Sequence, residues 1–296
     1  DLHRRRHSFP TRRSSDLKDK QVSVEFSHHG VSSLLSFIEV GEEKCVLKIP
    51  LNTTFADGEA TFLKAWESIG VATPHILREG AIADFPYILM SYVDASLLSD
   101  AIAQGKVKED VFVEMGRTLR MMHTPKAEGY GYVAEGKPQY KTFNDWVESE
   151  DMQKRIKLIQ ENNLLTDEHG SISKVLSVLI SYVEKNPIST YCHFDFGAKN
   201  ILNTTPLTVI DPNPMLNNGV IDIGRTIVLV VSGGSLERAE KLKRGYFGED
   251  SFDAQALQAS IILNTYMKFP YWHKKNKTQQ IARLQEYLAQ TRYLLE

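Results

Sequence analysis

The sequence of 296 residues predicts an α+β protein in which a small antiparallel sheet with one helix precedes a mostly helical region. Three observations support this fold class. Between residues 22 and 49, apolar and polar residues alternate, as in strands that bury one face. A helical pattern begins near Asp57, and from residue 97 onward most apolar residues recur with helical spacing. The chain is long enough for two domains, with 42% hydrophobic and 24% charged residues.

Composition excludes several classes of protein. No run of 18 or more apolar residues occurs, so we expect no membrane-spanning helix and no membrane partner. The two cysteines, Cys45 and Cys192, are far apart and lack the spacing of a metal site. They predict small buried residues in a reduced, cytoplasmic compartment.

Residues 1–17 are treated apart from the rest of the chain. The run HSFPTRRSSDL resembles the translated read-through of a sequencing adapter, although its arginines and serines would otherwise suggest a transit peptide or a nucleic-acid arm. Without the five arginines and two aspartates of residues 1–17, the formal net charge of −2 becomes −5. A mildly acidic chain does not favour nucleic acid as a partner. We expect residues 1–17 to be non-native and the natural N-terminus to be missing.

The first strands are expected over residues 22–26, 35–40 and 45–49, with a turn before the third. Lys48 interrupts the third apolar strand, where a lysine ordinarily faces solvent. In the helix that follows, Ala60, Leu63 and Trp66 form the buried stripe. Glu59 lies beside that stripe, either exposed or reaching back to pair with Lys48.

The chemistry is concentrated in residues 191–202 and 207–211. A polar loop carrying Asp195 leads into two short apolar runs, which turn residues 203–206 separate as in a β-hairpin. A hairpin brings its open ends together, so Asn200 and Asp211 converge. A carboxylate and an amide oxygen suit Mg²⁺, while Asp195 can orient a substrate hydroxyl. A lone Asp after a strand is more often a turn or cap residue, so the conjunction of groups carries the argument.

His193, Asp195 and Asn200 repeat the H-R-D-x-x-x-x-N spacing of the kinase catalytic loop. More closely, residues 193–202 resemble the H-G-D-x-x-x-x-N-I/L-L loop of the aminoglycoside phosphotransferase and choline kinase-like family of small-molecule kinases. The resemblance covers residues 18–296. Phe194 departs from the usual small residue, and Pro212 follows Asp211 where an aromatic is common.

The resemblance implies a bilobal, protein-kinase-like fold. Residues 18–93 would form the nucleotide-binding lobe and residues 94–296 the catalytic and substrate-binding lobe. The implied roles are a catalytic base at Asp195, Mg²⁺ ligands at Asn200 and Asp211, and structural supports at His193 and Asp222, the latter also predicted to cap a helix. For ATP, the resemblance implies phosphate contacts from Lys48, oriented by Glu59, and from Ser32 and Ser33, and adenine contacts from Met90, Ser91, Tyr92 and Val93.

Further helices are expected over residues 97–103, 107–123, 172–183, 222–231, 236–247, 252–269 and 277–295, and another helical pair is expected to begin with residues 143–147. A turn is expected over 128–132 and a loop over 212–219. The helix ending at His123 resembles one that the family ends in L-H, with a packing role for the histidine. In the family, the last three helices wall the acceptor pocket. This part of the chain carries several carboxylates: Glu237, Glu240, Glu249, Asp250 and Asp253. If they faced the acceptor pocket, they would favour a cationic acceptor. A run of charged residues is more often a solvated face.

These observations predict an enzyme that uses ATP and Mg²⁺ to phosphorylate a hydroxyl of a small molecule: an aminoglycoside-like compound, an amino alcohol or a sugar. We expect a monomer or a weak dimer. Two alternatives stay open. A metal-dependent phosphoesterase would need more histidine ligands near the carboxylates, and beyond the catalytic loop the C-terminal half offers only His273. A nucleotide-binding pseudokinase would act as an interaction module.

Overall fold

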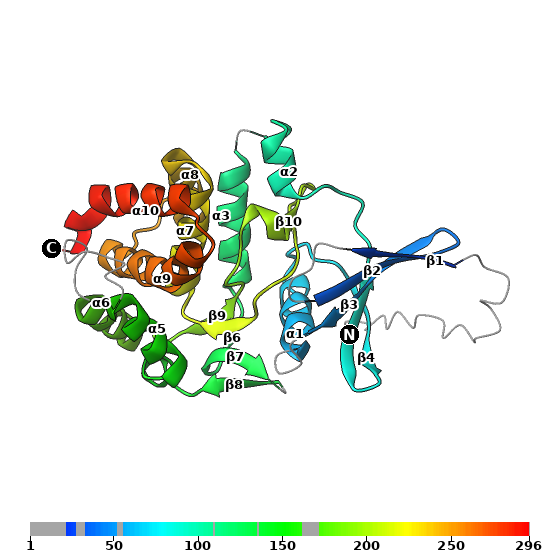
Figure 1. Cartoon of the computed structure of the whole chain (residues 1–296), viewed down its shortest axis with the longest axis horizontal. Coiled ribbons are helices and arrows are strands. Elements are labelled where there is room, and N and C mark those ends of the chain that lie inside the picture. The colour runs from blue at the N-terminus through cyan, green and yellow to red at the C-terminus, as the bar shows by residue number, and fades with distance from the viewer. Residues whose placement is uncertain are drawn as a thin grey trace, which may run out of the picture.

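The computed structural model has two lobes, with strands of the small lobe at one end and a group of helices at the other (Figure 1). It describes residues 22–27, 33–51, 56–108, 110–134, 136–161 and 172–295. The predictions made for residues 1–17 and for Ser32 fall outside these ranges. None of the helices in these ranges combines the length and hydropathy needed to cross a bilayer.

The small lobe contains an antiparallel sheet of five strands in the order β1-β2-β3-β5-β4. The three predicted strands and the strand before residue 91 are confirmed. Lys48 lies on β3 opposite Leu35 of β2 and Ile88 of β5. The bounds are β1 Val22–Ser27, β2 Ser33–Val40, β3 Glu43–Pro50, β4 Ile76–Ile82 and β5 Phe85–Ser91.

Helix α1, Ala56–Glu67, packs on this sheet and also reaches the large lobe. Its predicted stripe is buried, and Trp66 is fully enclosed. The indole Nε1 of Trp66 donates to the backbone oxygen of Met122 over 3.1 Å. Phe62 packs edge-on against Tyr191, with ring centroids 4.9 Å apart. One helix therefore contributes to the cores of both lobes.

The large lobe contains a second sheet that the sequence did not predict, with strand order β6-β9-β12-β7-β8. Two expectations are corrected by it. The predicted turn at 128–132 gives way at Tyr130 to β7, and the predicted loop at 212–219 contains β12. The strands are short, and all except β8 pair with a strand that is distant in the chain, so local periodicity is weak. The strands are β6 Lys126–Ala127, β7 Tyr130–Ala134, β8 Lys137–Tyr140, β9 Ser189–Cys192 and β12 Met215–Asn217.

The helices of the large lobe follow the predicted order, with boundaries shifted by a few residues. Close backbone approach explains two of their crossings: a Cβ at Gly245 of α8 would overlap the Val113 backbone of α3, and one at Gly224 of α7 would overlap Ser260 of α9. The helices are α2 Leu98–Ala103, α3 Val111–Met122, α4 Phe143–Val147, α5 Glu150–Glu161, α6 Ile172–Lys185, α7 Gly219–Gly233, α8 Leu236–Phe247, α9 Ala254–Lys274 and α10 Thr278–Thr291.

The N-terminus of α7 requires a correction. The cap residue is Asn218, whose side chain accepts a hydrogen bond from the amide of Val220, and Asp222 lies within the first turn. Asp222 is therefore not the N-cap that the sequence predicted. Its side chain is fully buried and is directed to the loop after β9.

Candidate active site

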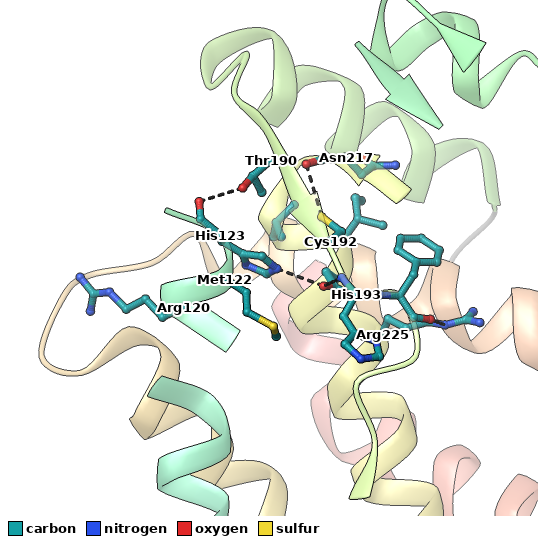
Figure 2. A network of polar contacts seen from close by, with 12 residues as sticks. Arg120, Met122, His123, Thr190, Cys192, His193, Asn217 and Arg225 are labelled. Atoms are coloured by element: carbon teal, nitrogen blue, oxygen red, sulfur yellow. Dashed lines mark hydrogen bonds and ion pairs between the residues drawn. The ribbon is translucent and has the colours of Figure 1, made fainter. Parts of the chain in front are cut away.

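The backbone of the loop after β9 is hydrogen-bonded to the carboxylate of Asp222. This carboxylate accepts hydrogen bonds from the backbone amides of His193, over 2.7 Å, and Phe194, over 2.9 Å. It also contacts Nε2 of His123 over 3.0 Å, and Figure 2 shows the dashed contacts that join His123 to this network. Nδ1 of His123 lies 2.7 Å from the Tyr246 hydroxyl. A buried carboxylate satisfied in this way fixes the path of the loop backbone.

Phe194 adopts a backbone conformation that is uncommon for a bulky residue. Its φ of 58° lies in the left-handed region, which explains why a small residue is usual at this place in the loop. The ring is buried, and the guanidinium of Arg225 lies 5.2 Å from its centroid. Nε of Arg225 donates to the Phe194 backbone oxygen over 3.0 Å. Arg225 is thus attached to Phe194 through both its backbone oxygen and its ring.

His193 holds the loop against the strand that follows it. Its Nε2 donates to the backbone oxygen of Ile210 over 3.1 Å, and its Nδ1 accepts from the amide of Asp195 over 3.3 Å. Burial lowers the pKa of His193, so the ring stays neutral and keeps one tautomer. The ring lies parallel to Trp66 of α1, with centroids 5.8 Å apart and planes 7° apart.

The predicted hairpin is present as β10, Ile201–Leu202, paired with β11, Thr208–Val209. The amide of Ile210 donates to the backbone oxygen of Asn200 over 3.1 Å, so Asn200 and Asp211 leave the ladder at the same end. Asn200 donates its side-chain amide to Asp195, at 2.8 Å from the backbone oxygen and 3.0 Å from Oδ2. The Asn200 Oδ1 atom remains as an acceptor. An amide oxygen beside a half-exposed Asp211 carboxylate is a donor set that fits Mg²⁺.

Lys48 links the two lobes at this point. Its ammonium forms ion pairs with Glu59 of α1, at 2.6 Å, and with Asp211. Both Lys48 and Glu59 are buried. Burial lowers the pKa of Lys48, but attraction to Glu59 and Asp211 outweighs that effect and raises the pKa above its ordinary value. The structure therefore brings together three residues that are distant in sequence.

Asp195 is surrounded by positive charge. Nζ of Lys199 lies 2.9 Å from Oδ2, and Nζ of Lys268, on α9, lies 3.5 Å from Oδ1. Burial raises the pKa of Asp195, but Lys268 and Lys199 outweigh it, so the pKa lies below its ordinary value and the group stays ionised. Burial, with Arg225 nearby, lowers the pKa of Lys268 to about 8.

Comparison with known proteins identifies the family. A model described as the phosphotransferase enzyme family matches residues 23–256. The chain belongs to this phosphotransferase family. A search of curated proteins gives no match.

Solved structures share the fold of the phosphotransferase. Aminoglycoside phosphotransferase APH(4)-Ia, as a thermostable mutant in complex with AMP-PNP and hygromycin B, is 16% identical, with 92% of this chain and 95% of that chain covered and a TM-score of 0.63. A putative fructosamine-3-kinase from Haemophilus somnus 129PT is 14% identical, with 92% of both chains covered and a TM-score of 0.59. Spectinomycin phosphotransferase APH(9)-Ia is 13% identical, with 94% and 96% covered and a TM-score of 0.54. The bilobal kinase-like fold predicted from the sequence is confirmed.

The segment expected to contact adenine in the phosphotransferase has little free hydrogen-bonding capacity. The amide of Ser91 donates to His75 over 2.9 Å, and that of Tyr92 donates to Lys44 over 3.3 Å. In the described part of the chain, the amide of Val93 makes no such bond. Met90 is buried and lies opposite Val46, on the face of the sheet that carries Lys48. Ser33 is also buried, at the start of β2.

Four of the five acidic residues singled out in the C-terminal part serve local structure in the phosphotransferase. Glu237 pairs with Lys241 and Glu240 with Lys243, both along α8. Asp250 pairs with Arg120 at 2.6 Å, and Asp253 accepts from the amide of Ala256 as the cap of α9. The charged groups that act on Asp195 are cations instead, so these carboxylates give no support to a cationic acceptor.

Proposed function

We propose that this phosphotransferase transfers the γ-phosphoryl group of ATP to a hydroxyl of a small molecule. The observation that carries the proposal is the contact of Lys48 with Glu59 and Asp211, which joins a lysine of the sheet to the loop region of Asp195 and Asn200. Phosphoryl transfer needs cations around the phosphate oxygens and a carboxylate at the nucleophile. The AMP-PNP complex of the aminoglycoside phosphotransferase supports ATP as donor.

Each residue has a distinct task in this proposal. Asn200, through Oδ1, and Asp211 would hold Mg²⁺, which neutralises phosphate charge when bound. Lys48, kept protonated by its two carboxylates, would bind phosphate oxygens. Asp195, kept ionised and oriented by Asn200, would accept a hydrogen bond from the acceptor hydroxyl and then its proton. Catalysis then rests on positioning and charge.

The nucleotide contacts follow from the remaining donors. Val93 offers its backbone amide to adenine, with Met90 behind the ring. The amides of Ser91 and Tyr92 already bond within the protein, so adenine would reach other groups of these two residues. Ser33 would contribute to phosphate binding, whereas Ser32 lies outside the described residues. His193 and Asp222 would keep the loop in place.

The two alternatives receive less support. A phosphoesterase needs a cluster of metal ligands, and within the described ranges the only compact group of this kind is His123, Cys192 and Asp222. Asp222 and His123 are already engaged in supporting the loop. A pseudokinase would lack part of the machinery, whereas Lys48, Asn200 and Asp211 are all present and in contact with partners.

Transfer of label from ATP tests the proposal. The protein is incubated with ATP labelled at the γ-phosphate, with and without Mg²⁺, and with a panel of sugars, amino alcohols and aminoglycosides. Label in an acceptor, dependent on Mg²⁺ and lost in Asp195→Asn, supports the proposal. Label released from ATP only as inorganic phosphate, with none in any acceptor, favours the phosphoesterase, and nucleotide binding without turnover favours the pseudokinase.

A further inference from the structure

A pocket of about 300 Å³ lies beside the loop that carries Asp195. Its walls come from the sheet and the helices of the large lobe, and Phe194 forms part of it. Aromatic and sulfur side chains supply most of the apolar surface: Tyr132, Tyr140, Trp146, Met152 and Met267. A pocket with these walls suits a flat or ring-shaped molecule.

The charged side chains at this pocket are mainly basic. Arg225 and Arg155 both line it, and Lys268 follows Met267 on α9. Only Nε of Arg225 has a hydrogen bond in the described part of the chain, so its two terminal nitrogens remain as donors. Arg155 is held by Asp151, which also lines the pocket. Lys268 is mostly buried, and Arg225 lies close enough to disfavour its charge.

Asp195 does not balance these cations by itself, although Asp222 also attracts Arg225. Lys199, Lys268 and Arg225 all act on the one carboxylate of Asp195. A bound hydroxyl that donates to Asp195 takes up part of the same carboxylate, which weakens its hold on Lys268. Like charges in a partly buried site repel, and an anion placed between them relieves that repulsion through charge-assisted hydrogen bonds.

We propose that the acceptor of this phosphotransferase carries a negatively charged group, a carboxylate or a phosphate, which Arg225 and Lys268 bind while its ring lies in the pocket. This inference rests on the proposed function, and it differs from the cationic acceptor that the acidic residues of α8 and of the segment after it would have favoured. Arg225 and Lys268 are then specificity-determining residues, because they select the acceptor by charge.

Four sugars that differ mainly in one charged group provide the test: D-glucuronate, D-glucose 6-phosphate, D-glucose and D-glucosamine. Their affinities for the complex of the full chain with Mg²⁺ and AMP-PNP are measured by calorimetry at constant ionic strength and neutral pH. We expect one or both anionic sugars to bind at least about tenfold more tightly than glucose, and glucosamine more weakly. The comparison of glucuronate with glucose 6-phosphate separates carboxylate from phosphate. Equal affinities, tighter binding of glucosamine, or no anionic binding up to about 50 mM would overturn the inference.

Two variants test whether Lys268 and Arg225 cause the preference for anionic sugars. Lys268→Met should reduce the ratio of anionic to neutral affinity about tenfold while leaving AMP-PNP affinity unchanged. Arg225→Gln should do the same, although it also removes the bond to Phe194. The control is Lys274→Met, an exposed lysine on the same helix, which should preserve the ratio. A uniform loss for all four sugars in Lys268→Met would indicate a structural role and contradict the inference.

The two proposals fail differently. If Mg²⁺ and AMP-PNP do not bind the wild-type protein, the proposed function fails. If the nucleotide binds but the sugars show no charge preference, only the inference about the acceptor fails.

Discussion

The side chains of Asn200 and Asp195 orient each other through hydrogen bonds: the Asn200 amide donates to the Asp195 carboxylate over 3.0 Å and to the Asp195 backbone oxygen over 2.8 Å. The bond fixes which way each side chain faces. It directs the amide oxygen of Asn200 away from Asp195, where a cation can use it, and it holds the carboxylate of Asp195 in place. Metal binding and acceptor activation are therefore linked through a single side chain.

Asp195 and Asp211 should differ when each is changed to asparagine. Asp211→Asn should weaken Mg²⁺-dependent binding of ATP and also lower turnover. Asp195→Asn should spare the affinity for ATP with Mg²⁺ and lower the transfer rate by at least about a hundredfold, because it removes the group that acts on the hydroxyl. Calorimetry with AMP-PNP and turnover on an accepted substrate measure both effects. An equal loss of nucleotide affinity in the two variants would show that Asp195 also binds the metal.

The Lys48–Glu59 pair should control the use of ATP. Lys48→Ala should raise the Michaelis constant for ATP and lower turnover about tenfold or more, since it removes a phosphate contact and leaves Glu59 buried without its partner. Glu59→Ala should act in the same direction more mildly. Steady-state kinetics measure both, with Lys64→Ala on the exposed side of α1 as control. Unchanged ATP kinetics in Lys48→Ala would contradict the assignment.

Gly245→Ala should destabilise the protein by about 1–3 kcal/mol, because the added methyl group would press against the Val113 backbone at the crossing of α3 and α8. Urea unfolding gives the change in the free energy of unfolding. Gly233→Ala is the matched control: its Cβ would meet no atom within 4 Å, and it should change stability by less than about 0.5 kcal/mol. Similar losses for both substitutions would show that helix packing at Gly245 is not the cause.

Lys268 should make stability depend on pH in the alkaline range. Its pKa is lowered from 10.5 to about 8, chiefly by burial and by Arg225, while Asp195 opposes the shift. Between about pH 8 and pH 10.5, Lys268 has lost its proton in the folded protein but keeps it in the unfolded chain. The free energy of unfolding therefore increases as the pH rises through this range. We expect the difference between wild type and Lys268→Met to change in favour of wild type by about 1–3 kcal/mol across this window. Urea unfolding at several pH values measures it, and a constant difference would rule it out.

Local patterns predicted those parts of the site that lie close in sequence. The turn chemistry after Leu202 was enough to place Asn200 and Asp211 at one end of a hairpin, and helical periodicity was enough to place Glu59 beside the buried stripe of α1. The resemblance to a family supplied the two lobes. The strand β12 was not predicted because it has only three residues and its partners, β7 and β9, are distant in sequence.

Tertiary contacts decided the rest. Lys268 is 73 residues from Asp195 in the sequence. The sequence pattern of α9 does not distinguish Lys268 from exposed lysines of the same helix such as Lys274. Asp222 has the residue type of a helix cap, yet its carboxylate bonds to the loop after β9, and Asn218 takes the cap position. The left-handed backbone of Phe194 depends on those same bonds, which no property of the residue itself indicates.

The attachment of Trp66 to Met122 and His193 has a consequence for how the enzyme is controlled. Turning α1 away from the sheet would break the indole hydrogen bond and bring Phe62 and Leu63 into water. Glu59 travels on the same helix, so its pairing with Lys48 is completed when the chain folds. The Lys48–Glu59 pair therefore forms as part of the folded chain, so we expect no control of this enzyme through rotation of α1.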